Sequence, residues 1–304
     1  MNRLEAMTTL MAAVDAGSLS AASRQLGVPL ATVSRRVSDL ETYLRAKLLI
    51  RTSRRLELTD AGRCYVAACR EILEQVDYAE RLASGEYAAP KGDIVVTAPI
   101  VFGRLHVLPV VTEFLDAYPD INVRLVQTDR VTNFMEDHVD VALRIGRLPD
   151  SGLVASRVGD VRCVVCASPN YQDRKGSAPL GHPQDLRHHP CITFEGLFSA
   201  DRWTFQENGR ATTVPIRSRL VVTTIETAID AAISGLGVAR VLSYQIAKAV
   251  KDGTLEVILD EFEPDPWPVS IVHSGQGLMP LKVRAFIDFA KERLRHRLAA
   301  ASDL

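Results

Sequence analysis

Apolar residues recur every three or four positions through the first 45 residues, which is the spacing of helices that bury one face. The pattern predicts helices over residues 2–15, 18–26 and 29–45. Ser18 is a favourable N-cap for the second helix, and Gly27 suits its C-terminal end. Two short helices joined by a glycine-containing turn are typical of a helix-turn-helix motif, whose second helix enters the major groove of DNA.

The outward-facing positions of this motif are the candidate DNA contacts. They are Ser18, Pro29, Leu30, Ala31, Thr32, Ser34, Arg35 and Arg36. Behind the motif, residues 48–50 and 56–58 are predicted as two short strands of a wing. The segment between the strands contains Arg51, Arg54 and Arg55, which suit DNA phosphates or the minor groove.

A long helical pattern follows Thr59, whose hydroxyl suits an N-cap. The apolar stripe continues for about six turns and predicts one helix over residues 60–84, with a hinge at 85–92. An exposed stripe of this length favours pairing with a second copy of the chain. The alternative is that the helix packs on its own head.

The rest of the chain alternates short apolar runs with helical patterns. The runs predict strands at 94–97, 123–126, 139–143, 163–166, 220–223, 238–242 and 269–273. The helical patterns lie at 107–118, 224–234, 243–251 and 280–298. This order favours an α/β body with largely parallel sheets.

Composition adds a charge asymmetry to this picture. The chain has 304 residues and a net charge of −1. Residues 1–60 carry nine basic and six acidic side chains, so the head has a net charge of +3 and the remainder −4. A basic head on an acidic body favours a polyanionic partner, although a solvated surface would look the same. No apolar run reaches the roughly 18–20 residues of a membrane span. We therefore expect neither a membrane span nor a signal peptide, and the five cysteines favour a reducing cytoplasm.

Several spaced blocks of sequence together carry a family resemblance. In the head they lie at residues 4–7, 17–22, 26–27, 33–35, 40–41 and 58–62, and in the body at 99–103, 108–119, 140–146, 167–171, 235–237 and 282–286. The chain resembles the LysR-type transcriptional regulators over essentially its whole length. It departs from the family at Pro29-Leu30-Ala31, where Ser-Gln-Ser is frequent, and this leaves fewer polar side chains to read bases.

The resemblance implies a two-lobed, periplasmic-binding-protein-like α/β effector domain, an all-α winged helix-turn-helix head and a long linker helix. The expected domains are a DNA-binding domain at 1–59, a linker at 60–90 and an effector domain at 91–304. The expected crossovers near 162–165 and 268–271 leave 91–161 plus 272–304 as the first lobe and 166–267 as the second. The implied partners are double-stranded DNA, a small-molecule effector, further copies of the chain as a homodimer or homotetramer, and RNA polymerase.

The cleft between the lobes should be lined where strands end and helices begin. The candidate effector-binding residues are Pro99, Ile100, Val101, Thr128, Asp129, Arg144, Thr193, Phe194, Thr223 and Thr224. Helix N-termini and hydroxyl groups favour an anion, so we expect an organic or aromatic acid. Two roles stay open: Thr223 as part of a capping box with Glu226, and Arg144 as a partner of Asp140 or Asp129.

Other functions find less support in the sequence. Cys163 and Cys166 have redox-motif spacing, but on a strand they point to opposite faces, so we interpret them as buried thiols. The histidines and the cysteine within 182–191 lack zinc-site spacing, and no catalytic motif is present, so neither a metal, a cofactor nor an enzyme is expected. A small-solute-binding protein with a vestigial head is the alternative, and redox sensing is a third hypothesis.

Overall fold

The computed structural model describes residues 2–51, 56–84, 89–130, 134, 139–148, 152–171, 179–195, 201–275 and 279–300. The chain divides into two compact units with a boundary between Ala89 and Pro90. The first unit contains the head and a long helix, and the second contains both large sheets. The candidate residues Arg54 and Arg55 lie outside the described residues, as does the side chain of Arg51.

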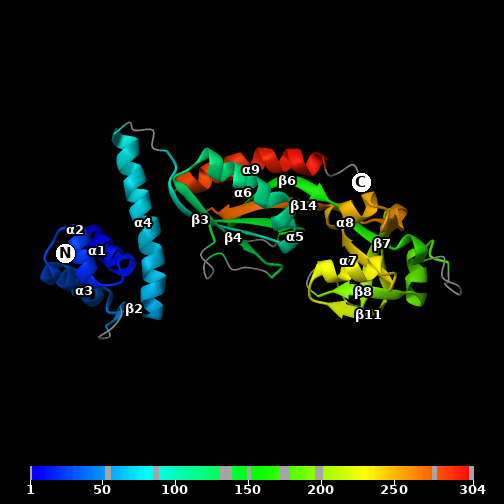
Figure 1. Ribbon diagram of the computed structural model, residues 1–304, viewed down its shortest axis with the longest axis horizontal. Helices are drawn as coiled ribbons and strands as arrows, with labels where there is room; N and C mark the ends of the chain where they lie inside the picture. Colours follow the sequence, from blue (N-terminus) through cyan, green and yellow to red (C-terminus); the bar gives the residue numbers. More distant parts are fainter. Residues whose placement is uncertain are drawn as a thin grey trace. The chain divides into compact units, whose positions relative to one another are not determined.

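The head is built from three helices and a two-stranded wing, as the hydrophobic spacing predicts (Figure 1). Its elements are α1 (Arg3–Asp15), α2 (Leu19–Leu26), α3 (Leu30–Leu44), β1 (Leu49–Arg51) and β2 (Leu56–Leu58). The predicted N-cap at Ser18 is confirmed, because its hydroxyl accepts a hydrogen bond from the Ala21 N–H at 3.1 Å. Gly27 closes α2 with φ of 65°, the left-handed conformation that glycine adopts without strain.

The long helix α4 (Asp60–Ser84) starts where predicted, with the Thr59 hydroxyl accepting a hydrogen bond from the Gly62 N–H at 2.9 Å. Val66 and Cys69 of α4 are buried in the core of the head. The first part of the apolar stripe therefore packs on the chain's own head, which is the alternative considered above. Further along, Ile72 is 40% exposed, so the helix retains an apolar position that the head does not cover.

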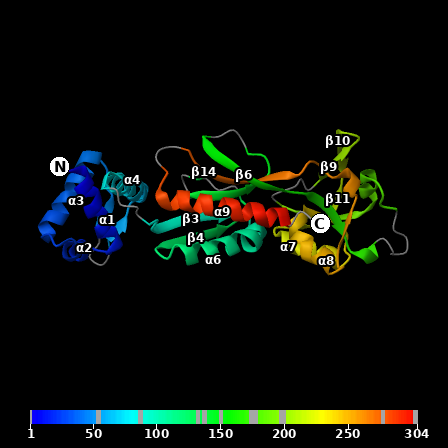
Figure 2. The same ribbon diagram turned by 90° about the horizontal axis from the view of Figure 1, so that it is seen from above.

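The second unit contains two five-stranded sheets (Figure 1). The first has the strand order β4-β3-β5-β14-β6. Its strands are β3 (Gly92–Ala98), β4 (Ile121–Gln127), β5 (Val141–Ile145), β6 (Leu153–Val161) and β14 (Trp267–Ser274). Figures 1 and 2 show α6 (Leu108–Ala117) and α9 (Leu281–Ala300) side by side along this sheet, and Phe114 of α6 packs edge-on against Phe286 of α9.

The second sheet has the strand order β11-β8-β12-β7-β13. Its strands are β7 (Cys163–Ala167), β8 (Pro190–Phe194), β11 (Arg217–Val222), β12 (Val238–Leu242) and β13 (Glu256–Ile258). Helix α7 (Ile225–Ile233) packs on β8, β11 and β12, and α8 (Ser243–Lys251) follows β12 directly. The hairpin of β9 (Arg202–Glu207) and β10 (Arg210–Pro215) places Trp203 and Phe205 in a core cluster with Val165 and Val238. Short 3-10 turns lie at Pro169–Tyr171, Pro183–His188 and Asp260–Phe262.

Two sequence expectations about the body need correction. The sheets are mixed rather than largely parallel, because β14 pairs antiparallel with both β5 and β6, and β7 pairs antiparallel with β12 and β13. The second crossover lies before Trp267, not at 268–271, since all of β14 is hydrogen-bonded into the first sheet. Residues 267–271 therefore belong to the first lobe, while the first crossover, at Arg162 between β6 and β7, lies at the edge of the expected range.

Candidate DNA-binding head and effector cleft

The first turn of α3 presents an apolar surface to solvent. Pro29, Leu30 and Ala31 are all exposed, and Leu30 keeps 46% of its surface accessible. The buried stripe of the same helix consists of Val33, Val37 and Leu40, which pack into the head. One face of α3 thus packs into the core of the head, and the exposed candidate DNA-contacting residues lie outside that face.

The polar candidates in the motif differ in solvent exposure and in their side-chain partners. Arg35 is exposed, whereas Arg36 is half-buried and forms an ion pair with Glu5 of α1 at 3.0 Å. Thr32 and Ser34 are half-buried. Ser18 uses its hydroxyl to cap α2, so its side chain has a structural role in the described conformation.

A buried carboxylate joins the wing to the end of α3. Glu41 is 4% exposed, and its carboxylate accepts hydrogen bonds from the N–H groups of Leu48 at 2.9 Å and Leu49 at 3.1 Å. Lys47 donates a further hydrogen bond at 2.9 Å. Burial acts to raise the pKa of Glu41, but the three donors outweigh it, and the pKa lies below its ordinary value. Sequence reasoning missed this role, although an acidic residue next to the apolar stripe at Leu40 was a usable signal.

In the first lobe, the segments that follow strands β3 and β4 lie next to each other at the carboxyl edge of the sheet. Pro99 precedes a continuous helical stretch formed by α5 (Ile100–Phe102), a π-helical turn (Gly103–Val107) and α6. The Ile100 N–H donates to the Asp129 carboxylate at 3.1 Å, so these two candidates lie together. Thr128 accepts a hydrogen bond from the Arg130 N–H at 3.2 Å. Val101, in contrast, is 3% exposed and belongs to the core.

In the second lobe, the candidate threonines fall into two groups. Thr193 is buried, and its hydroxyl lies 2.9 Å from that of Ser218, while the neighbouring Phe194 is also buried. Thr223 and Thr224 are exposed at the start of α7. The capping box with Glu226, one of the two roles left open for Thr223, is not formed: the N-cap is Thr224, no side chain caps the helix, and the Thr224 hydroxyl lies 2.7 Å from that of Thr227.

An electrostatic interaction connects candidate residues of the two lobes. Burial raises the pKa of Asp129, the Ile100 N–H opposes the rise, and the carboxylate of Glu226 in α7 adds to it. Glu226 follows Thr224 by two residues, so the start of α7 and the end of β4 share one electrostatic environment. Arg144 on β5 is half-buried, and burial lowers its pKa. Asp140, one of its expected partners, accepts a hydrogen bond from the Val95 N–H at 2.7 Å.

An aromatic contact that the sequence did not predict joins the lobes. The ring of Tyr244, in the first turn of α8, meets Phe102 with centroids 5.5 Å apart and His106 with centroids 5.4 Å apart. Both contacts are edge-on, a favourable geometry for aromatic rings. His106 is 8% exposed, and neither of its ring nitrogens has a hydrogen-bond partner. Burial, and secondarily Arg297, lowers the pKa of His106 to about 4, so the ring is neutral at physiological pH.

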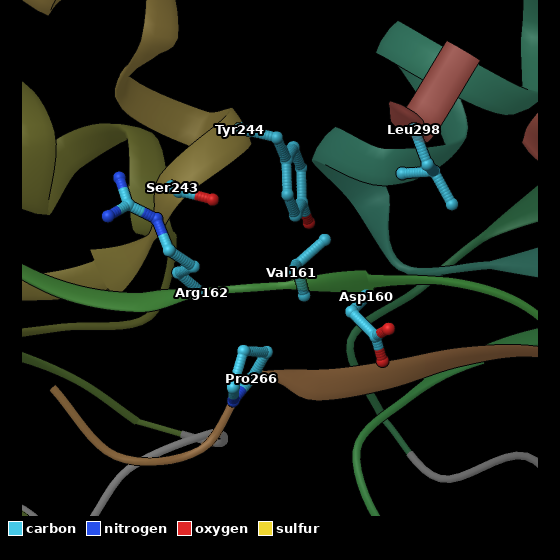
Figure 3. Close-up of a pocket in the computed structure, with 7 residues that line it drawn as sticks. All are labelled: Asp160, Val161, Arg162, Ser243, Tyr244, Pro266 and Leu298. Carbon is cyan, nitrogen blue, oxygen red and sulfur yellow. The ribbon is translucent and has the colours of Figure 1, made fainter. Parts of the chain in front are cut away.

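A cavity of about 210 Å³ lies beside this contact, where both crossover segments meet α8 and α9 (Figure 3). It is lined by Asp160, Val161, Arg162, Ser243, Tyr244, Pro266 and Leu298. Figure 3 shows the Tyr244 ring extending from α8 toward Val161, while the Arg162 guanidinium points away from the cavity. Arg162 forms an ion pair with Glu263 at 3.5 Å, so an ion pair as well as packing joins the two crossover segments.

The two cysteines with redox-motif spacing are side chains of strand β7. Cys163 and Cys166 are both buried, and burial raises the pKa of Cys166 to about 12, which disfavours a reactive thiolate. Burial also raises the pKa of Cys163, although Arg240 donates to its sulfur at 3.0 Å. Within the described ranges there is no group of three or more metal-ligating side chains. Among those same residues, no helix has the length and apolar character needed to cross a bilayer.

Together these features define a class: a DNA-binding winged helix-turn-helix head combined with a two-lobed α/β effector-binding body. Residues 4–63 match the family model of the bacterial regulatory helix-turn-helix proteins of the lysR family, and residues 88–295 match the LysR substrate binding domain. The chain belongs to the LysR family of transcriptional regulators.

Relatives agree over nearly the full chain. An HTH-type transcriptional repressor of Pseudomonas aeruginosa is 32% identical over 96% of this chain and 92% of its own length. The solved structure of CrgA, a LysR-type transcriptional regulator from Neisseria meningitidis, aligns with a TM-score of 0.60 and 30% identity over 95% of this chain and 98% of CrgA. Full-length AphB, a virulence activator of Vibrio cholerae, aligns with a TM-score of 0.59 and 26% identity over 94% of this chain and 98% of AphB. These relatives are regulators rather than enzymes, and this chain is a DNA-binding regulator that senses an effector.

Proposed function

We propose that two or more copies of the chain bind DNA through their heads, and that a small organic acid in the interlobe cleft changes how the heads are held. The observation that carries this proposal is the combination, in one chain, of an exposed first turn of α3 and two sheet-containing lobes whose segments meet near Asp129 and Glu226. The effector acts by linkage, because a ligand that prefers one arrangement of lobes or subunits shifts the population toward it. Couplings of this kind are typically about 1–3 kcal/mol, enough to change operator occupancy about tenfold.

The proposed DNA contacts follow from the charge of the wing segment and from position on α3. Arg51, Arg54 and Arg55 of the wing contact phosphates or the minor groove, which accounts for most of the affinity. Thr32, Ser34 and Arg35 of α3 set the register and read bases. Arg36 contributes less than its position suggests, because it has to leave Glu5 before it binds DNA.

A salt titration of duplex binding by the full chain tests this assignment. Replacing one phosphate-contacting residue, as in Arg54→Ala, should lower the slope of log affinity against log salt by about 0.9 and weaken all sequences equally. Lys251→Ala is the matched control, since Lys251 is an exposed cation of the body and should leave the slope unchanged. An altered base preference at constant slope would contradict the wing assignment. Absence of salt-sensitive duplex binding would favour the alternative, a small-solute-binding protein with a vestigial head.

The effector is proposed to place its carboxylate at the start of α7. The first-turn N–H groups of this helix have no side-chain cap, and Thr223 and Thr224 are exposed beside them. Such a helix start favours an anion. Asp129 and Glu226 add negative charge to the same cleft, so we further propose an acid that also carries a hydroxyl or amino donor.

Calorimetric titration of the full chain with small hydroxy, amino and aromatic acids tests the effector proposal, with the matching primary amides as probes that lack the carboxylate. We expect binding by an acid and at least tenfold weaker binding by its amide. Thr223→Val should weaken the acid and leave duplex binding without effector unchanged. Equal affinity for acid and amide would rule out the carboxylate site. Contact with RNA polymerase stays a prediction of family membership.

A further inference from the structure

The start of α3 carries an exposed leucine that is not a member of the core clusters of the head. Leu30 is the first residue of α3 and is 46% exposed, between Pro29 and Ala31, which are exposed as well. The core cluster beneath this end of the helix is formed by other residues, including Val33 and Ala22. Nearly half of this branched side chain stays accessible, so it is available to a bound partner.

The surrounding side chains indicate what that partner is. Arg35 is exposed five residues further along the same helix, and the head as a whole has a net charge of +3 over residues 1–60. A polyanion fits this charge, and the first turn of a recognition helix is the part that reaches base edges. Among base edges in the major groove, the 5-methyl group of thymine is the apolar one.

We infer that Leu30 reads the 5-methyl group of a thymine in the operator half-site. The inference rests on the proposed placement of α3 in the major groove. Fewer polar side chains are fully exposed along the start of α3, because Arg36 pairs with Glu5 at 3.0 Å and both Thr32 and Ser34 are half-buried, which leaves Arg35 as the exposed polar candidate. Leu30 therefore supplies base discrimination by apolar contact, with Ala31 extending the same surface.

The size of the effect follows from the area that one methyl group removes from water. Burial of one such group stabilises by about 0.8 kcal/mol, which corresponds to roughly a fourfold change in dissociation constant. Substitution of uracil for thymine removes the methyl group and leaves the hydrogen-bonding edge and the backbone unchanged. The comparison thus isolates the contact from phosphate binding.

The experiment begins with selection of duplexes from a random library by the full-length chain at fixed salt. Each thymine of the selected half-site is then replaced singly by uracil, and the dissociation constants are measured. We expect roughly fourfold weaker binding at one or two positions. Leu30→Ser should bind the thymine and uracil duplexes equally, whereas Leu30→Met, which keeps an apolar side chain, should retain the preference.

Leu4→Ser is the control for loss of any exposed leucine of the head, since Leu4 lies on α1 and is 41% exposed. It should leave the thymine-to-uracil ratio unchanged, even if it alters affinity for all duplexes alike. Equal binding of thymine and uracil duplexes by the native chain overturns the inference, and so does a preference that survives in Leu30→Ser. A chain that selects no sequence and binds no duplex overturns the proposed function, and this inference with it.

Discussion

The buried carboxylate of Glu41 is predicted to hold the wing in place. In Glu41→Ala the N–H groups of Leu48 and Leu49 lose their acceptor, and these residues are only 1% and 5% exposed. An unsatisfied buried N–H group costs about 1–3 kcal/mol, so the two together destabilise the joint between wing and helix by about 2–6 kcal/mol. Glu41→Gln keeps one acceptor oxygen and should cost less, since it loses only the charge that attracts Lys47.

Hydrogen exchange of the full chain, measured by mass spectrometry, reports this loss of stability peptide by peptide. Peptides covering the end of α3 and β1 should exchange at least about thirtyfold faster in Glu41→Ala, while peptides of the body stay unchanged. The lowered pKa adds a pH signature: the contribution is present above the ordinary value of 4.5 and is lost as the pH falls through the folded-state value. Glu41→Gln should lack that acid-dependent component. Unchanged protection of β1 in Glu41→Ala would refute the assigned role.

Two further predictions concern the body and the start of α4. Between pH 6.5 and about 4 the unfolded chain binds a proton at His106, whereas the folded chain does not. The free energy of unfolding should therefore decrease by up to about 3 kcal/mol as the pH is lowered through this range. In His106→Phe, denaturation followed through Trp203 and Trp267 should lose that dependence, and an unaltered pH profile would contradict the burial argument. Gly62→Ala should destabilise the head by about 1–3 kcal/mol, because the added methyl group collides with the Leu48 carbonyl oxygen. Thermal melts followed by far-UV circular dichroism test this prediction. Gly181→Ala, with open space around the added methyl group, is the neutral control, and equal melting of the two variants would contradict the clash.

Local signals explain which parts of the fold the sequence could predict. The three helices of the head have regular apolar spacing, and the caps at Ser18 and Thr59 are decided by neighbouring residues. The hairpin of β9 and β10 was missed although its turn is Asn208-Gly209, both with positive φ, which is a strong two-residue hairpin signal. Strand β6 gave no such signal, because its side chains alternate poorly between buried and exposed.

Long-range pairing explains what the sequence could not predict. The second crossover depends on the register of β14 against β5 and β6, strands that are more than a hundred residues away along the chain. The candidate site divides in the same way. Ile100 and Asp129 were predicted from strand ends and do lie together, whereas Tyr244 had no local pattern that marks it as a contact between lobes.

The Tyr244 contact gives the proposed linkage a physical size. Any rearrangement that separates the lobes at this point has to remove Tyr244 from both Phe102 and His106. Each edge-on aromatic pair contributes about 0.5–1.5 kcal/mol beyond its buried area, so the two together amount to about 1–3 kcal/mol. That matches the coupling free energies typical of allosteric proteins. Separation of the lobes also exposes the apolar area of the Tyr244 ring, which is 5% exposed, so an effector proposed near Asp129 has to compensate at least this amount before it changes which arrangement of the lobes is populated.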